Sequence, residues 1–381
     1  MKSRHATSIT VAGAGFAAIT GVRELRKALP DATITLVAPR PEFVYLPSLI
    51  WVPYGIRSGD DLRFDIRPLL KELRVDYKQA AVTGISGDGR TLHTDAGDLQ
   101  NDALLIATGG RYIKKLPGIG NAITICEGIE AAERMGAALR SLDSGTIAMG
   151  FGGNPKEPSA MRGGPMFELL FGLDTWLRQQ GTRDRFRLVF FTPAPRPGQR
   201  LGDRAVDKLL AEMARREIDT HLGHKMKSFE NQVVATEGGE IPADLILFMP
   251  GMTGPAWIQG SPLPLSPGGM IQADAMARVN GMERVYVAGD AGSFPGPDWM
   301  PKQAHMADLQ AAAAAKNIAL NLAGREASEK FKVELLCIID SLDKGILVYR
   351  GEKRSLALPS MAPLHWSKIY LEKVYLRHLR K

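Results

Sequence analysis

A glycine-rich turn near the N-terminus places the strongest constraint on the fold of this chain. Residues 13–18 read GAGFAA and directly follow Ser8–Ala12, a short apolar segment typical of a buried strand. The stretch Ala17–Leu29 reads as a helix, and Thr33–Val37 reads as a second buried strand. A strand, a glycine turn, a helix and a parallel strand form a βαβ unit. The sequence therefore predicts an α/β fold that opens with a Rossmann-like unit.

The small residues of this turn have separate physical roles. Gly13 allows the tight turn, Gly15 lets the backbone approach a pyrophosphate, and Ala18 replaces a third glycine and keeps the helix close to the sheet. The helix N-terminus adds unpaired N–H donors and a positive dipole end. We therefore predict that Gly13, Gly15, Phe16 and Ala17 bind the diphosphate of a dinucleotide.

Two later strand ends extend the pattern. The segment Leu104–Gly109 (LLIATG) turns the chain past the cofactor, and Val285–Asp290 (VYVAGD) directs a carboxylate from a strand end towards a sugar-alcohol hydroxyl. Three such strand ends in this order are far more specific than any one alone, and they indicate FAD. The binding residues predicted from these two segments are Ala107, Thr108, Gly109, Gly289 and Asp290.

The end of the second strand departs from the usual dinucleotide pattern. An acidic residue commonly binds the ribose hydroxyls there, whereas this chain has Ala38, followed by Pro39 and Arg40. The ribose must then be held by backbone or by a neighbour, or Arg40 lies over the adenine or the phosphates. We include Ala38 and Arg40 among the predicted cofactor contacts, and the missing acid argues against NAD at this site.

A second α/β unit begins at Thr146–Met149, but its glycine turn is altered. Residues 150–155 read GFGGNP, and Pro155 blocks the helix start that should follow at this spacing. This change argues against NADH as the electron donor. The expected organisation is two Rossmann-like, glutathione-reductase-like domains and a C-terminal segment with an amphipathic helix: an FAD domain of residues 1–117 and 243–325, a second domain of residues 118–242, and the segment 326–381.

On these motifs the sequence resembles the pyridine nucleotide-disulfide oxidoreductase superfamily. Within it, the chain is similar to the sulfide:quinone oxidoreductases and the flavocytochrome c sulfide dehydrogenases over nearly its whole length. The loop Phe43–Val52, Glu168 after Gly-Pro, Lys302 before an alanine-rich helix, and Cys337 all carry this resemblance. It implies an oxidoreductase that passes electrons from a small sulfur donor through FAD to a quinone. Because no cysteine lies in Phe43–Val52, the FAD is expected to be non-covalent.

The resemblance also implies roles for individual residues. Cys337 would lie at the flavin face where the donor attacks, and Cys126 would be an accessory thiol. Glu168 would manage protons near the thiols, and Lys302 would lie near the flavin and the quinone. The remaining predicted cofactor contacts are Pro47, Val82 and Gln303.

The cysteine set departs from the family pattern, because the usual partner of Cys337 is missing. Residues 159–162 read SAMR, and Cys126 is the only other cysteine in the chain. Three interpretations stay open: Cys126 pairs with Cys337; Cys337 acts alone, with Arg162 lowering its pKa or binding an anionic substrate; or sulfide chemistry is lost. The alternative functions are an NADH:quinone oxidoreductase and a non-catalytic flavin protein that transfers electrons or acts as a sensor through a partner subunit.

The tail Leu364–Lys381 reads as a basic amphipathic helix suited to an anionic membrane interface. No apolar run is long enough to span a membrane, and no signal segment is visible. The net charge of +7 comes without zinc-finger or RNA-binding signatures, so we expect neither nucleic acid nor metal. We expect a cytoplasmic protein, peripheral on the inner membrane face, with a homo-oligomer left open. The apolar residues of the tail helix are Trp366, Ile369, Tyr370, Val374 and Tyr375.

Overall fold

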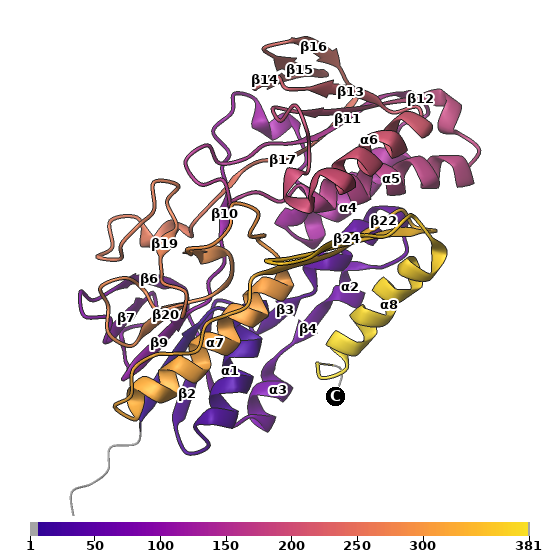
Figure 1. Cartoon of the computed structure of the whole chain (residues 1–381). Helices are drawn as coiled ribbons and strands as arrows, with labels where there is room; N and C mark the ends of the chain where they lie inside the picture. The colour runs from indigo at the N-terminus through magenta and orange to yellow at the C-terminus, as the bar shows by residue number, and fades with distance from the viewer. Residues whose placement is uncertain (1–6, 380–381) are drawn as a thin grey trace, which may run out of the picture.

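The computed structural model describes residues 7–379 as two parallel sheets covered by helices, followed by an antiparallel C-terminal sheet (Figure 1). The first sheet has five parallel strands in the order β20-β9-β1-β2-β5. Ala12 pairs with both Val37 and Ile106, so the carboxyl ends of these strands meet at one edge. The strands are β1 (Ser8–Ala12), β2 (Thr33–Ala38), β5 (Val75–Gln79), β9 (Ala103–Ile106) and β20 (Val285–Val287).

Two helices, α1 (Phe16–Ala28) and α7 (Ala304–Leu322), pack against each other and against this sheet (Figure 1). Both begin at the edge where the strands end, so their N-termini face the same region. Backbone geometry fixes the turn before α1, because Gly13 has a φ of +122° and a Cβ there would lie 2.2 Å from the carbonyl oxygen of Ala107. Only glycine fits this position, and the predicted βαβ unit is confirmed.

The second parallel sheet has the order β13-β12-β11-β17. Its last strand changes the expected domain boundary at residue 243, because β17 pairs in parallel with β11 and thus belongs to the second unit. Helices α4, α5 and α6 lie near this sheet, and the antiparallel meander β14-β15-β16 forms a separate sheet beside it (Figure 1). The elements are α4 (Ile129–Arg140), β11 (Gly145–Phe151), α5 (Gly164–Gln179), β12 (Phe186–Thr192), α6 (Asp203–Arg215), β13 (Asp219–Leu222), β14 (Met226–Glu230), β15 (Val233–Thr236), β16 (Gly239–Pro242) and β17 (Leu245–Met249).

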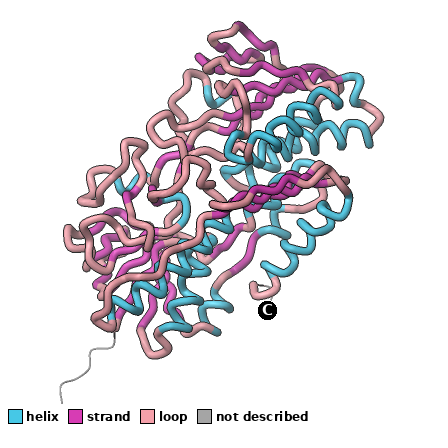
Figure 2. The backbone as a smooth tube through the Cα atoms, viewed as in Figure 1, coloured by secondary structure: helices cyan, strands magenta, loops and turns pink. Residues whose placement is uncertain are grey.

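The C-terminal segment forms a three-stranded antiparallel sheet and a final helix. Strand β22 packs against α5 of the second unit on one side and against α8 on the other, and Figure 2 shows these strands between the helices. This placement brings the end of the chain to the junction between the two parallel sheets. The elements are β22 (Glu334–Asp340), β23 (Gly345–Gly351), β24 (Ser355–Ala357) and α8 (Ala362–Leu376).

Shorter elements connect these layers. The apolar loop expected at Phe43–Val52 forms the end of a small strand pair and then a 3₁₀ helix, η1 (Leu46–Tyr54), which is largely buried. The hairpin expected at Val82–Thr94 is confirmed. The remaining strands and helices are β3 (Glu42–Val44), α2 (Gly59–Leu62), β4 (Arg63–Asp65), α3 (Arg67–Glu72), β6 (Val82–Ile85), β7 (Thr91–Thr94), β8 (Leu99–Gln100), β10 (Arg111–Tyr112), β18 (Met252–Thr253), β19 (Ile271–Gln272) and β21 (Gly292–Ser293).

Candidate active site

A cavity of about 970 Å³ opens where the carboxyl edge of the first sheet meets the second unit and the C-terminal sheet. This volume lies in the range of sites that bind large organic ligands. The predicted residues that line it come from all three parts of the chain. They are Gly15, Phe16, Ala17, Pro47, Ala107, Gly109, Cys126, Glu168, Gly289, Asp290, Lys302, Gln303 and Cys337.

Five other predicted contacts lie outside the wall of this cavity. Gly13 closes the turn against Ala107, and the Thr108 hydroxyl accepts a hydrogen bond of 3.2 Å from the indole of Trp257. Ala38 ends β2, and its carbonyl oxygen accepts a hydrogen bond of 2.8 Å from the Tyr77 hydroxyl. The other two are Arg40, exposed after β2, and Val82, half-buried in β6. Their contacts with the cofactor stay predictions.

The turn before α1 has the features of a phosphate site. Gly15 is the N-cap of α1 and has no side chain to satisfy the first N–H groups of the helix. A Cβ at Gly15 would meet no atom within 4 Å, so this backbone borders open space. Unpaired helix N–H groups beside open space suit a pyrophosphate.

A second orphan group lies near the N-terminus of α7. The side-chain oxygen of Gln303 is buried, and among the described residues it has no hydrogen-bond partner. Such a group needs a donor, and Gln303 lines the cavity. The imide N–H of a flavin would supply that donor. The residues present therefore fit FAD at both its pyrophosphate and its ring.

Lys302 directly precedes Gln303 in the chain and also lines the cavity. Its side chain is buried, its ammonium donates a hydrogen bond to the carbonyl oxygen of Gly292, and it lies 5.7 Å from the centre of the Phe294 ring. Burial lowers the pKa of Lys302 to about 8, with the charge of Asp290 opposing this effect. A lysine with such a pKa can carry a cation at neutral pH and release a proton in mildly alkaline conditions.

Arg162 lies in the segment 159–162, where the resemblance to the family implies a cysteine. Its guanidinium forms an ion pair with Asp290 and donates a hydrogen bond of 3.3 Å to the carbonyl oxygen of Lys302. Only 16 % of the Arg162 side chain is exposed. No local pattern predicts this pairing, because the two residues lie 128 positions apart.

Both cysteines line the cavity as free thiols. Burial raises the pKa of Cys126 to about 11 against the charge of Arg162, and burial together with Glu168 raises the pKa of Cys337 to about 12. Lys368 is the cation that opposes this effect on Cys337. Arg162 acts on Cys126, and the interpretation in which Cys337 acts alone, with Arg162 lowering its pKa or binding an anionic substrate, stays a prediction.

Glu168 is buried in α5 and forms an ion pair with Lys368 of α8. Burial raises the pKa of Glu168 to about 7, although the Lys368 ammonium opposes this effect. A carboxyl group with a pKa near neutrality can accept or release a proton under physiological conditions. Its charge also acts on Cys337, so the carboxyl group and the thiol share one electrostatic environment.

Helix α8 contributes to the site in a way that differs from the expected surface helix. Lys368 faces the interior, and Tyr375 packs against the aromatic rings of Phe16, Phe43 and Tyr45. These two residues therefore do not belong to an exposed amphipathic face. The helix is apolar on more than one side, and sequence periodicity alone did not separate its inner side from its outer side.

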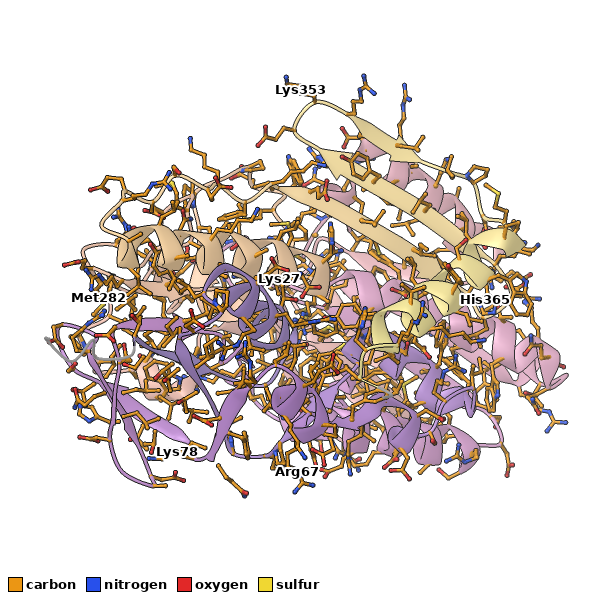
Figure 3. The ribbon with its side chains drawn as sticks, turned by 90° about the horizontal axis from the view of Figure 1, so that it is seen from below. Lys27, Arg67, Lys78, Met282, Lys353 and His365 are labelled. Atoms are coloured by element: carbon orange, nitrogen blue, oxygen red, sulfur yellow. The ribbon has the colours of Figure 1, made fainter. Side chains whose placement is uncertain are left out.

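A buried hydrogen bond between side chains anchors α8 to the C-terminal sheet. The ring Nδ1 of His365 lies 2.7 Å from the carboxylate of Asp340, which also accepts a hydrogen bond of 3.1 Å from the indole of Trp51. Figure 3 shows His365 on α8 beside the strands of the C-terminal sheet. This contact holds the helix that carries Lys368 against the cavity.

The second nucleotide site is altered in the manner predicted from Pro155. Strand β11 ends at Phe151, and α5 begins only at Gly164, so no helix N-terminus follows the strand directly. The amide of Asn154 holds the intervening loop by hydrogen bonds of 2.9 and 3.0 Å to the carbonyl oxygens of Met252 and Gly268. The first turn of α5 instead lies beside Cys337, whose sulfur would be 3.9 Å from a Cβ at Gly164.

Comparison with known proteins agrees with this fold. A family model described as pyridine nucleotide-disulphide oxidoreductase matches residues 177–313. A sulfide-quinone reductase of Aquifex aeolicus is 26 % identical over 355 residues, which cover 88 % of this chain and 81 % of that protein. The solved structure of the sulfide:quinone oxidoreductase of that bacterium has a TM-score of 0.88 at 23 % identity and covers 98 % of this chain and 92 % of its own.

The predicted resemblance is confirmed. The chain has the fold of the pyridine nucleotide-disulphide oxidoreductases, and its cofactor is FAD. A second group of relatives shares this fold: a type II NADH:quinone oxidoreductase of Staphylococcus aureus is 23 % identical over 390 residues, covering 96 % of this chain and 93 % of that protein. The chain is therefore an FAD-dependent oxidoreductase.

Proposed function

We propose that the protein passes electrons from a reduced sulfur compound through FAD to a quinone. The observation that carries this proposal is the position of Cys337, beside the first turn of α5 and in the same cavity as Glu168 and Lys302. Bound FAD would accept two electrons from the donor and pass them to the acceptor.

The protein's own groups would bind the donor and move its protons. The Cys337 thiol is protonated at neutral pH, because its pKa is about 12. A nucleophilic thiol must lose its proton, and Glu168 is the carboxyl group whose charge acts on it. Lys302 would balance negative charge on the side towards the acceptor. Cys126 would serve as the accessory thiol, since it lines the same cavity.

An NADH:quinone oxidoreductase is the second candidate, because the Staphylococcus aureus relatives carry that name. The loop held by Asn154 argues against it, since a pyrophosphate would find no helix N-terminus directly after β11. A non-catalytic flavin protein that transfers electrons or senses redox state through a partner subunit is the third candidate.

Anaerobic stopped-flow mixing separates these three candidates. Purified holoprotein is mixed with sulfide or with NADH, and flavin absorbance is followed. Bleaching by sulfide alone supports the proposal, and bleaching by NADH alone refutes it in favour of the second candidate. An oxidised spectrum with both donors supports the third. Re-oxidation by a soluble quinone analogue then tests the acceptor.

We also propose that α8 contacts a membrane surface from which quinone reaches the site. Its exposed apolar side chains, defined here as the α8 patch, are Trp366, Tyr370, Leu371 and Val374, which are 47–67 % exposed. Aromatic and aliphatic side chains exposed on a helix that also carries lysine and arginine suit an anionic interface. Among residues 7–379, no helix is long and apolar enough to cross a membrane, so the contact would be peripheral. The cytoplasmic location and a homo-oligomer stay part of this proposal.

A further inference from the structure

One wall of the cavity carries three cations, and the cofactor does not account for two of them. This cationic wall consists of Arg200, which lies after β12 in the second unit, Arg350 in β23, and Lys302 before α7. The phosphate-binding turn belongs to the first sheet, at the N-terminus of α1. Arg200 and Arg350 come from the second unit and from the C-terminal sheet, so they are not needed to neutralise the cofactor pyrophosphate.

Arg200 is a half-buried cation without an ion-pair partner among the described residues. One of its guanidinium nitrogens donates a hydrogen bond of 3.0 Å to the carbonyl oxygen of Ser159. Burial lowers the pKa of Arg200 to about 10, even though the charges of Asp298 and Glu157 oppose this effect. A desolvated guanidinium gains most from a ligand that supplies negative charge and acceptor atoms.

Neither of the two nearby carboxylates forms an ion pair with Arg200 among residues 7–379, although the charges of both act on it. Glu157 accepts hydrogen bonds of 2.8, 3.2 and 2.6 Å from the hydroxyls of Ser159, Ser293 and Ser266 instead. Asp298 lines the same cavity but is exposed to solvent, which weakens the effect of its charge. The charge of Arg200, which also lines the cavity, is therefore only partly balanced.

Arg350 is held rigidly beside Arg200. One of its guanidinium nitrogens donates hydrogen bonds of 3.2 and 2.9 Å to the carbonyl oxygens of Gln199 and Arg200, and its guanidinium lies 5.0 Å from the centre of the Trp299 ring. Within residues 7–379 it forms no ion pair. A guanidinium fixed by carbonyl and aromatic contacts loses little side-chain entropy when it binds an anion.

The neighbouring cation Arg162 is already neutralised, because it is paired with Asp290. The positive charges of Arg162 and Arg200 both lower the pKa of Lys302, so Lys302, Arg162 and Arg200 interact electrostatically. The cationic wall thus offers two guanidinium groups without carboxylate partners and one buried ammonium to a ligand in the cavity.

We propose that the cationic wall is a subsite for a small dianion, with sulfur oxyanions and polysulfides as the chemical class. This inference rests on the proposed function and adds a substrate class to it. Two guanidinium groups can bind the oxygen or sulfur atoms of such an ion by charge-assisted hydrogen bonds. The dianion would enter between the second unit and the C-terminal sheet, on the route towards Cys337, which lines the same cavity.

The test is equilibrium binding of sulfate to the oxidised holoprotein, measured by isothermal titration calorimetry. Sulfate is the probe because it is a dianion that does not reduce flavin, and sodium chloride keeps the ionic strength constant. We expect saturable binding that Arg200→Gln and Arg350→Gln each weaken about tenfold or more. Arg200→Lys should bind with intermediate affinity. Arg204→Gln is the matched control, because Arg204 is exposed and close in sequence.

Competition then distinguishes the possible dianions. Thiosulfate and tetrasulfide are each titrated against bound sulfate, and the one that displaces it at the lower concentration identifies the preferred class. FAD content, measured from the ratio of absorbance at the flavin and protein bands, shows that each variant is folded. Binding of sulfate that is equal in the native protein and in Arg200→Gln with full FAD content would overturn the proposal.

The experiment separates this inference from the proposed function. Reduction of the flavin by sulfide without Arg200-dependent sulfate binding would leave the proposed function intact and remove the subsite. Sulfate binding that depends on Arg200, without flavin reduction by any sulfur donor, would support the subsite and refute the proposed function. Absence of any sulfate binding to the native protein at constant ionic strength also refutes the subsite.

Discussion

Replacing Glu168 with glutamine tests whether this carboxyl group carries a proton at neutral pH. Its pKa rises from the ordinary 4.5 to about 7 because burial penalises the charged form. At about 1.4 kcal/mol per pH unit, ionising Glu168 in the folded protein costs about 3 kcal/mol more than in the unfolded chain. The folded state then holds its proton more tightly, so Glu168 stabilises the protein below pH 4.5, and this contribution is lost as the pH rises to about 7.

The assay is the free energy of unfolding of the holoprotein in urea, measured for the native protein and for Glu168→Gln between pH 5 and 8. Glutamine cannot ionise, so the variant should gain stability relative to the native protein as the pH rises, by up to about 1.4 kcal/mol per pH unit, and the difference should level off above pH 7. Glu237→Gln is the control, because Glu237 is exposed. A stability difference that does not change with pH would refute the reasoning.

Three other predictions test the site and the surface. Cys337→Ser should slow flavin reduction by sulfide by at least about a hundredfold, whereas Cys126→Ser should slow it less; equal rates for the native protein and Cys337→Ser in stopped-flow mixing would contradict the role of this thiol. Gly15→Val should fold but lose FAD, because its side chain would fill the space beside the N-terminus of α1; full flavin absorbance after purification would argue against this phosphate site. Replacing both Trp366 and Tyr370 with alanine should weaken flotation with anionic vesicles while sulfide still reduces the flavin, and unchanged flotation would exclude the α8 patch.

The cofactor turn could be predicted from the sequence because its determinants are local. Gly13 and Gly15 lie in one short segment, and the spacing of glycines after an apolar run encodes both the turn and the helix start. Asp290 follows the end of another strand, β20. Because β1 and β20 both pair in parallel with β9, the glycine turn and Asp290 lie at the same edge of the sheet. The same reasoning predicted from Pro155 that no helix would begin directly after β11.

The electrostatics of the site could not be predicted in this way, because they depend on residues that are distant in sequence. Glu168 and Lys368 lie 200 positions apart, and nothing local to α8 indicated that this lysine faces inward. Arg200 and Arg350 likewise meet only after the C-terminal sheet has packed beside the second unit. The predicted domain boundary at residue 243 differs from the structure for a similar reason. Strand β17 pairs with β11, which lies about 100 positions earlier in the chain, and no local pattern indicates this partner.

The position of α8 also has a consequence for how the protein acquires its cofactor during synthesis. Tyr375 lies 5.2 Å from Phe16 between ring centres, so a residue that is synthesised after both parallel sheets packs against the helix predicted to bind the pyrophosphate. Lys368 of the same helix completes the ion pair in the cavity. Domains generally fold in the order of their synthesis, but this site is completed only after α8 has been synthesised. A chain that stops before α8 should therefore retain little FAD.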